Sequence, residues 1–276
     1  MKGKRIFVTG GASGLGRALA ERYARAGWRA CIGDVNEERG TETVAALRVL
    51  SGDGHFLRCD VTREADLQAA ADWLEREWGG VDVVVNNAGV AIGGGITEVP
   101  ISDWEWIVDV NLLGVARGCR VFTPLLRRGG GGHLVNVASL AGLVHMPQMS
   151  AYNATKAAVV ALSETLYLEL AGDGIGVSVV CPAFFRTNLT ESLRAGNPEV
   201  DALTRRLVNQ AKRGADEIAE IVYRGVERGE FRILTDPEGR VAWRLKRLAP
   251  FSVYARLMAR TAQRFMGGSG GKRPGG

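Results

Sequence analysis

The chain has 276 residues, of which 46% are hydrophobic and 24% are charged, a composition typical of one large globular α/β domain. It excludes a wholly disordered chain and a coiled coil, and no apolar run reaches the roughly 18–20 residues of a membrane-spanning helix. Four well-separated cysteines without a CxxC pair predict buried free thiols, and the glycine-interrupted N-terminus predicts no secretory signal. We therefore expect a cytoplasmic protein.

The net charge of +5 is divided unevenly along the sequence. Nine of the 35 Lys/Arg but none of the 30 Asp/Glu lie from Arg240 onward, so residues 1–239 carry a net charge of −4. The basic character belongs to the C-terminal part, which argues against a nucleic-acid-binding surface on the main domain. We expect a main domain over 1–239, a basic helical extension over 240–266 and a disordered glycine-rich tail over 267–276.

Short apolar runs alternate with longer amphipathic stretches in the main domain. The runs predict strands at 5–9, 29–33, 55–59, 81–85, 132–138 and 176–180. The stretches predict helices at 16–26, 37–50, 64–77, 102–126 and 151–170. Strands rich in β-branched residues and separated by helices predict a doubly wound, Rossmann-like parallel sheet covered on both faces.

A glycine-rich loop lies between the first predicted strand and the first predicted helix. Gly10, Gly14 and Gly16 are spaced by four and two residues, with Ser13 directly before Gly14 and Leu15 between Gly14 and Gly16. Glycine permits a tight turn and close approach of backbone amides to a pyrophosphate, which the helix N-terminus also attracts. The pattern predicts a dinucleotide site, and the alternative is a turn that only packs the helix.

An acidic residue, Asp34, ends the second predicted strand, and Val35 follows it. A carboxylate there can accept both ribose hydroxyls of an adenosine and would repel a 2′-phosphate, which favours NAD over NADP. Arg17 and Arg39 are near in sequence, so an NADP-linked enzyme stays open as an alternative.

A tyrosine and a lysine, Tyr152 and Lys156, are four residues apart at the start of a predicted helix and so share one face. A nearby ammonium favours the phenolate and would lower the pKa of the tyrosine. Ser139 follows the fifth predicted strand, at the sheet edge where ligands bind in open α/β sheets. The alternative is a surface lysine beside a half-buried tyrosine.

Together these motifs resemble the short-chain dehydrogenase/reductase family. The matching segments are TGGASGLG (9–16), Asp34, CDV (59–61), NNAG (86–89), Asn111, Ser139, YNATK (152–156) and the segment from Pro182 to Thr187. The family usually has glycine where this chain has Ala183, and a β-carbon there would require an adjusted loop if the backbone needed a positive φ.

The resemblance implies a role for each matching residue. Tyr152 would be the general acid/base, Lys156 would lower its pKa and hold the nicotinamide ribose, Ser139 would polarise the substrate oxygen, and Asn111 would hold a water linked to Lys156. The implied cofactor contacts are the glycine loop with Asp34 and Val35, then Asp60, Val61, Asn87, Ala88, Gly89, Pro182 and Thr187. It also implies a homodimer or homotetramer that pairs through the helices predicted at 102–126 and 151–170.

Apolar residues follow Ser139 and Pro182, which predicts a hydrophobic substrate such as a secondary alcohol or its ketone. The candidate substrate contacts are Ala141, Leu143, Met146, Phe184, Phe185 and Leu189, although several of them can equally be ordinary core. No acidic or histidine cluster has metal-ligand spacing, so we expect no metal.

The C-terminal extension predicts two helical pieces within 241–266, separated at Pro250. In the second piece Phe251, Tyr254, Met258, Ala262 and Phe265 form one face, and Arg256, Arg260 and Arg264 another. Such a helix docks on the body or on a partner subunit, or it lies on anionic lipid.

The sequence as a whole predicts an NAD-preferring oxidoreductase. The alternative from another class is an NAD(H)-sensing scaffold that acts through the basic extension.

Overall fold

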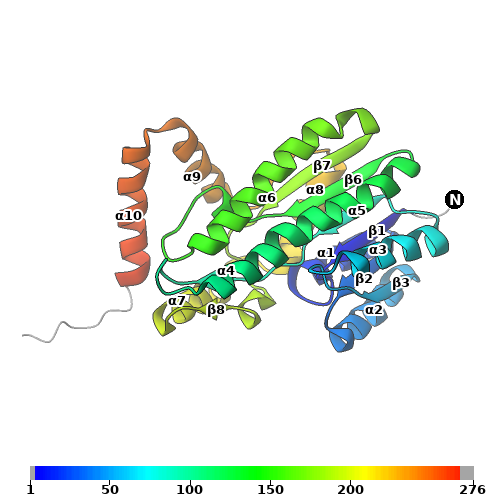
Figure 1. The fold of residues 1–276 in the computed structure, drawn as a ribbon, viewed down its shortest axis with the longest axis horizontal. Coiled ribbons are helices and arrows are strands. Elements are labelled where there is room, and N and C mark those ends of the chain that lie inside the picture. Colours follow the sequence, from blue (N-terminus) through cyan, green and yellow to red (C-terminus); the bar gives the residue numbers. More distant parts are fainter. Residues whose placement is uncertain (1–3, 268–276) are drawn as a thin grey trace, which may run out of the picture.

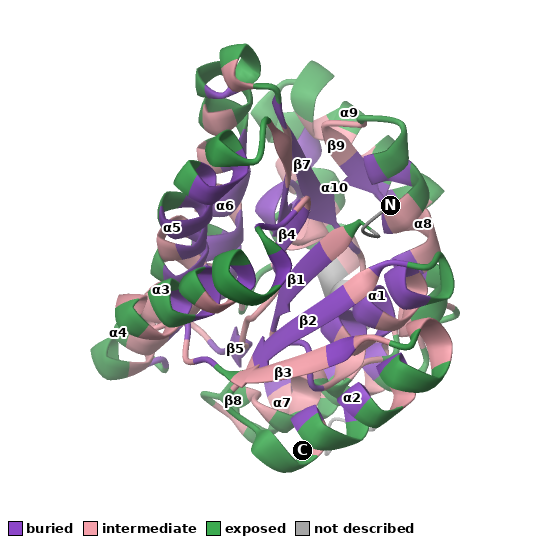
Figure 2. Cartoon of the chain, turned by 90° about the vertical axis from the view of Figure 1, so that its right-hand side faces the viewer, coloured by how far each residue is buried: buried purple, intermediate pink, exposed green. Residues whose placement is uncertain are grey.

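In the computed structural model, residues 4–267 are described, with side chains up to Thr261. A seven-stranded parallel sheet forms the centre, in the order β3-β2-β1-β4-β6-β7-β9 (Figures 1 and 2). The strands are β1 (Arg5–Thr9), β2 (Arg29–Asp34), β3 (Gly54–Arg58), β4 (Val83–Asn86), β6 (Gly132–Val137), β7 (Ile175–Cys181) and β9 (Arg232–Leu234). The predicted fold class is confirmed. The sheet has one strand more than predicted, β9, because a strand of three residues is too short to show an alternation of apolar and polar side chains.

Helices cover both faces of this sheet. One layer contains α1 (Gly14–Arg25), α2 (Glu37–Ser51) and α8 (Ala215–Glu227); the other contains α3 (Glu64–Trp73), α5 (Gly114–Arg128) and α6 (Ser150–Glu169). Figure 2 shows the buried strands between these two layers. All four cysteines are buried in this core with free thiols.

The helix predicted over 102–126 is interrupted. It consists of α4 (Ile101–Val108), a π-helical turn (Asp109–Leu113) and α5. Such turns insert one extra residue into the helical ladder and often occur at functional sites. Here the turn contains Asn111, which is fully buried.

The segment after β7 crosses the carboxyl edge of the sheet. It contains a 3₁₀ turn (Asn188–Glu191), the short strand β8 (Arg194–Ala195) and α7 (Pro198–Asn209). β8 pairs in parallel with β5 (Ile92–Gly93), and this small second sheet fixes the segment beside the loop that follows β4.

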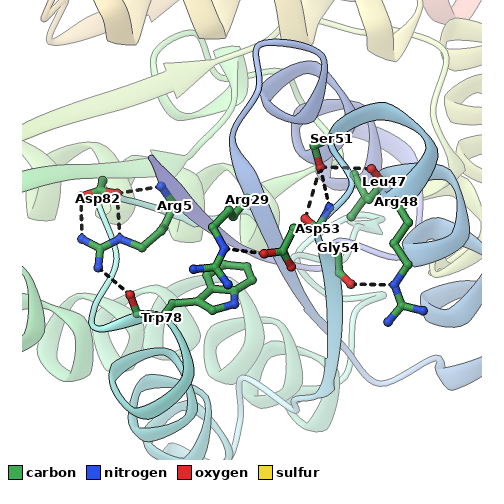
Figure 3. Close-up of polar contacts among 9 residues, drawn as sticks. All are labelled: Arg5, Arg29, Leu47, Arg48, Ser51, Asp53, Gly54, Trp78 and Asp82. Atoms are coloured by element: carbon green, nitrogen blue, oxygen red, sulfur yellow. Dashed lines mark hydrogen bonds and ion pairs between the residues drawn. The ribbon is translucent and has the colours of Figure 1, made fainter. Parts of the chain in front are cut away.

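The opposite, amino-terminal edge of the sheet is held by arginines (Figure 3). Arg5 donates from Nε and Nη2 to the two Asp82 oxygens at 2.9 and 2.8 Å, and from Nη1 to the Trp78 carbonyl at 3.1 Å. Arg29 pairs with Asp53, and its guanidinium lies 4.5 Å from the centre of the Trp78 ring. The charged groups at this edge are thus paired within the fold.

Two helices follow β9: α9 (Pro237–Leu248) and α10 (Phe251–Gly267), with Pro250 between them as predicted. They lie at the end of the molecule opposite β2 and β3 (Figure 1). Tyr254 is buried and Met258 half-buried against the body, whereas Phe251 is exposed, unlike the predicted face. Ala262, Phe265 and Arg264 lie beyond the described side chains, and 268–276 lie outside the described residues. No helix within residues 4–267 is both long and apolar enough to cross a bilayer.

Candidate active site

The glycine loop brings the backbone closer than any side chain would permit. Gly10 and Gly14 have φ of +64° and +53°, in the left-handed region that favours glycine. A Cβ on Gly16 would lie 2.1 Å from the Gly10 carbonyl oxygen and 2.5 Å from Nδ2 of Asn87. The loop therefore requires glycine at these positions for its own shape.

The start of α1 is open to an anion. Its N-cap residue, Ser13, makes no side-chain capping bond, and the first turn of the helix carries no acidic residue. A shallow hollow of about 170 Å³ lies here, and its lining includes Gly14, Thr187, the basic residues Arg17 and Arg186 and the acidic residues Glu21 and Asp216. Unpaired amides and the positive end of a helix dipole are the usual partners of a pyrophosphate, so the loop fits a dinucleotide.

The carboxylate of Asp34 is half-buried beside this loop. Its oxygens accept from the backbone N–H of Ala12 and of Asn36, each at 3.0 Å. A carboxylate has about four acceptor positions, so capacity remains for ribose hydroxyls. The next residue, Val35, is exposed at the same edge.

Thr9 connects the loops after β1 and β4. Its hydroxyl accepts from the N–H of Asn87 at 3.0 Å and of Ala88 at 3.1 Å. The side chain of Asn87 donates back to the carbonyls of Thr9 and Gly10. These bonds hold the segment around Gly89 against the glycine loop.

The remaining predicted cofactor residues follow β3 and β7. Asp60 accepts from the hydroxyl and N–H of Thr62, and Val61 is buried. Pro182 accepts at its carbonyl from the Leu140 N–H, 2.8 Å away. Gln148 is the one non-glycine residue with a positive φ among those described, so Ala183 has an ordinary negative φ. The loop therefore accepts the β-carbon of Ala183.

Tyr152 and Lys156 lie on one face of α6, as their spacing predicts. The Lys156 Nζ is 5.8 Å from the centre of the Tyr152 ring and donates to the Val137 carbonyl at 3.0 Å. Ser139 begins the turn after β6, where its Oγ accepts from the Ala141 N–H at 3.1 Å and donates to the Pro182 carbonyl at 3.4 Å.

Burial controls the charges of these groups. It lowers the pKa of Lys156 to about 8, and it raises the pKa of Tyr152 above its usual value despite the opposing effect of the Ser139 hydroxyl. Desolvation is the larger effect on Tyr152 in this structure, and the lowering of its pKa by the Lys156 ammonium stays a prediction. Tyr152 is a neutral proton donor here.

Asn111 lies behind the loop that contains Gly89. Its Oδ1 accepts from the Val90 N–H at 2.8 Å, and its Nδ2 donates to the Val90 carbonyl at 2.9 Å. A Cβ on Gly89 would lie 3.2 Å from Asn111 Oδ1 and 3.4 Å from Lys156 Nζ, so both side chains face this glycine. In this structure Asn111 fixes the backbone beside the lysine.

Comparison with known proteins agrees with this geometry. A sequence model described as short chain dehydrogenase matches residues 4–198. The chain belongs to the short chain dehydrogenase family. It is 38% identical to D-threitol dehydrogenase of Mycolicibacterium smegmatis, over 79% of this chain and 84% of that protein.

Two solved structures share the fold. A short chain dehydrogenase/reductase from Burkholderia phymatum in complex with NAD has a TM-score of 0.85 at 37% identity, covering 89% of this chain and 93% of that one. An alcohol dehydrogenase from the archaeon Thermococcus sibiricus, complexed with 5-hydroxy-NADP, has a TM-score of 0.73 at 25% identity, covering 84% and 95%. Relatives of this oxidoreductase thus bind either cofactor.

An apolar cluster surrounds Tyr152 in this family member. It contains Ala141 and Leu189, both predicted, together with Trp104 and Trp106 from α4, which the sequence analysis missed. No motif marks these tryptophans, although their position one or two turns before Asn111 could have pointed to them.

The other predicted substrate contacts lie elsewhere. Leu143 packs into the main core, Phe185 packs against the α1 and α8 side, and Phe184 is exposed. Met146 is half-buried, and its carbonyl accepts from Asn153 Nδ2. Of the apolar residues clustered with Tyr152, Trp104 and Trp106 come from α4 and Leu189 from the 3₁₀ turn Asn188–Glu191. No group of His, Cys, Asp or Glu within residues 4–267 is arranged to hold a metal ion.

Proposed function

We propose that this short chain dehydrogenase is an NAD-preferring enzyme that transfers hydride between the cofactor and a hydrophobic secondary alcohol or its ketone. The observation that carries the proposal is the buried Tyr152, which lies in an apolar cluster at the carboxyl edge of the sheet and shares one helix face with Lys156. A bound nicotinamide would supply the hydride donor or acceptor.

The protein's own contribution is proton transfer and orientation. The Ser139 hydroxyl would hydrogen-bond the substrate oxygen, while the neutral Tyr152 Oη donates a proton to that oxygen during ketone reduction. In alcohol oxidation the direction reverses, and the deprotonated Oη of Tyr152 receives the proton of the substrate hydroxyl. Lys156 would place positive charge beside the phenolate formed by reduction, and the apolar cluster would exclude water from the reacting groups.

The charges near Asp34 support the preference for NAD. Arg17 and Arg39 are the two arginines near enough in sequence to bind a 2′-phosphate, and both are paired. Arg17 Nε lies 2.8 Å from Glu21, and Arg39 Nη1 lies 2.6 Å from Glu191. A 2′-phosphate would have to displace a carboxylate and would also face Asp34.

Substrate size follows from the same cluster. Trp104, Trp106 and Leu189 belong to the apolar cluster that contains Tyr152, and one charged group, the Arg194 guanidinium, lies 3.6 Å from the centre of the Trp106 ring. The apolar area of this cluster favours a cyclic or long-chain alcohol over a small polyol. We also propose a homodimer or homotetramer, because α4, the π-helical turn and α6 present exposed apolar side chains: Ile101, Leu113, Tyr167 and Leu168.

The test is the variant Tyr152→Phe, which keeps the buried ring and removes the proton. We expect kcat to fall by about 10²–10⁴-fold, the usual contribution of a general acid/base, with the Kd for NADH unchanged. The control is Tyr167→Phe, which changes an exposed tyrosine on the same helix. Turnover is measured with NAD and NADP on cyclic alcohols and on D-threitol. Equal activity of Tyr152→Phe would refute the assigned role, and turnover of the polyol alone would refute the substrate class.

A further inference from the structure

The C-terminal helices α9 and α10 each have a docked face and an exposed face. On the docked face of α9, Gly239 packs against Leu140, Trp243 packs on the main core, and Lys246 Nζ donates to the Leu143 carbonyl at 2.7 Å. On α10, Tyr254 is buried and Met258 half-buried. The helices are therefore fixed to the turn that follows Ser139.

The outward face of α9 is apolar where a water-exposed helix face is normally polar. Val241, Leu245 and Leu248 are spaced by four and three residues, so they form one stripe, and Leu248 is 83% exposed. On α10 the exposed apolar side chains include Phe251, at 77%, Val253, at 50%, and Leu257, at 46%.

Exposed arginines accompany this stripe on both helices: Arg240, Arg244 and Arg247 on α9, and Arg256 and Arg260 on α10. The structure shows no ion pair between any of these five and a carboxylate in residues 4–267; the ion pairs that it does show all lie before residue 237. The chain has no acidic residue after Glu238. The positive charge of this end is therefore not neutralised by the protein.

We propose that the exposed faces of α9 and α10 bind the surface of an anionic lipid bilayer. An apolar stripe flanked by arginines is the pattern of a helix that lies in the membrane interface, with side chains such as Leu248 among the acyl chains and the guanidinium groups at the phosphates. The inference stands on the exposed faces and their charge and does not depend on the proposed activity.

Charge also argues against a second copy as the occupant. A symmetric contact places the same patch on both partners, so the arginines of one copy would face the basic patch of the other, which contains no carboxylate after Glu238. An anionic bilayer presents the opposite charge and an apolar interior at once. It complements both features of the surface.

The position of the helices gives the contact a consequence for the site. α9 touches Leu140 and Leu143, one and four residues after Ser139. A bilayer bound to its outer face would lie next to the turn that carries this catalytic residue. A lipophilic substrate could then pass between the bilayer and the site over a short distance.

The test is co-sedimentation of the full chain with vesicles of phosphatidylcholine, with and without about one third phosphatidylglycerol. We expect binding to the anionic vesicles only. Salt at 0.5 M should weaken this binding, because it shortens the Debye length to about 4–5 Å and so screens the attraction between the arginines and the lipid phosphates. The double variant Arg244→Glu/Arg260→Glu should lower the partition coefficient at least about tenfold, and Leu248→Ser should lower it several-fold.

The matched control is Val49→Ser/Arg76→Glu, which changes an 87% exposed apolar residue and an exposed arginine remote from α9 and α10. It should bind like the unaltered chain. Circular dichroism and the Kd for NADH show whether each variant is folded. Absence of binding to anionic vesicles, or equal loss in the control, overturns the proposal. A third outcome would also overturn it: the unaltered chain does not bind vesicles, and light scattering shows that the arginine variant has a different oligomeric state. The face would then be a subunit contact.

Discussion

Lys156 is a charged group that the fold holds at a cost in stability. Its side chain is 4% exposed, and burial lowers its pKa from 10.5 to about 8. At about 1.4 kcal/mol for each pH unit, this corresponds to roughly 3 kcal/mol against the folded state at pH 7. We therefore predict that Lys156→Met, which removes the charge and keeps the volume, makes the protein more stable and inactive.

The sign of the pH dependence follows from the two pKa values. Below pH 8 the lysine is protonated in both the folded and the unfolded state, so the full cost is present. Between pH 8 and 10.5 the folded state loses the proton first, so the cost decreases and disappears above pH 10.5. Loss of the hydrogen bond to Val137 removes about 1 kcal/mol at every pH. The net gain is roughly 2 kcal/mol at pH 7 and near zero at pH 10.

The assay is urea unfolding of both proteins at pH 7 and pH 10 without cofactor. The titratable groups that do not interact with Lys156 are the same in both proteins, so the difference in unfolding free energy reports on Lys156 together with its coupled neighbour Cys181. Lys212→Met, at an exposed lysine, is the control and should change neither value appreciably. If Lys156→Met is less stable than the parent by the same amount at both pH values, the assignment of a costly buried charge is wrong.

Two further predictions concern the cofactor. Gly16→Ala places a Cβ 2.1 Å from the Gly10 oxygen, so the Kd for NADH measured by calorimetry should rise at least about tenfold. The control Gly172→Ala adds its Cβ in open space and should leave this Kd unchanged. Equal affinities of the two variants would contradict the loop geometry. Glu191→Gln releases Arg39 from its ion pair and should shift the ratio of NADP to NAD affinity toward NADP by up to about fivefold. Adding Arg39→Gln to this variant should reverse the shift. An unaltered ratio in Glu191→Gln would show that Arg39 does not reach the 2′-phosphate.

The local chemistry of the cofactor loop could be predicted because it depends on residues close in sequence. The glycines at 10, 14 and 16 and the acidic end of β2 are visible without a structure, since a strand, a tight turn and a helix have strong local preferences. The spacing of Tyr152 and Lys156 fixes their shared face in the same way. The roles of these residues toward a bound cofactor and substrate stay predictions.

The sequence did not reveal the short elements that depend on distant partners. β9 and the β5–β8 pair have two or three residues each, and only pairing with strands remote in sequence makes them ordered. The π-helical turn around Asn111 is likewise invisible to a helical periodicity, although it orients that residue toward Val90.

The sequence by itself determined the fold class, the loop that fits a dinucleotide and the positions of the family's motifs, because hydrophobic periodicity and glycine geometry act within a few residues. Only the tertiary structure decided the electrostatics of the site. The pKa of Tyr152 is raised because desolvation depends on everything that packs around it, including Trp104 from another helix. The docking of α9 beside Ser139 was also decided there, since burial of one helix face selects its partner from the whole molecule.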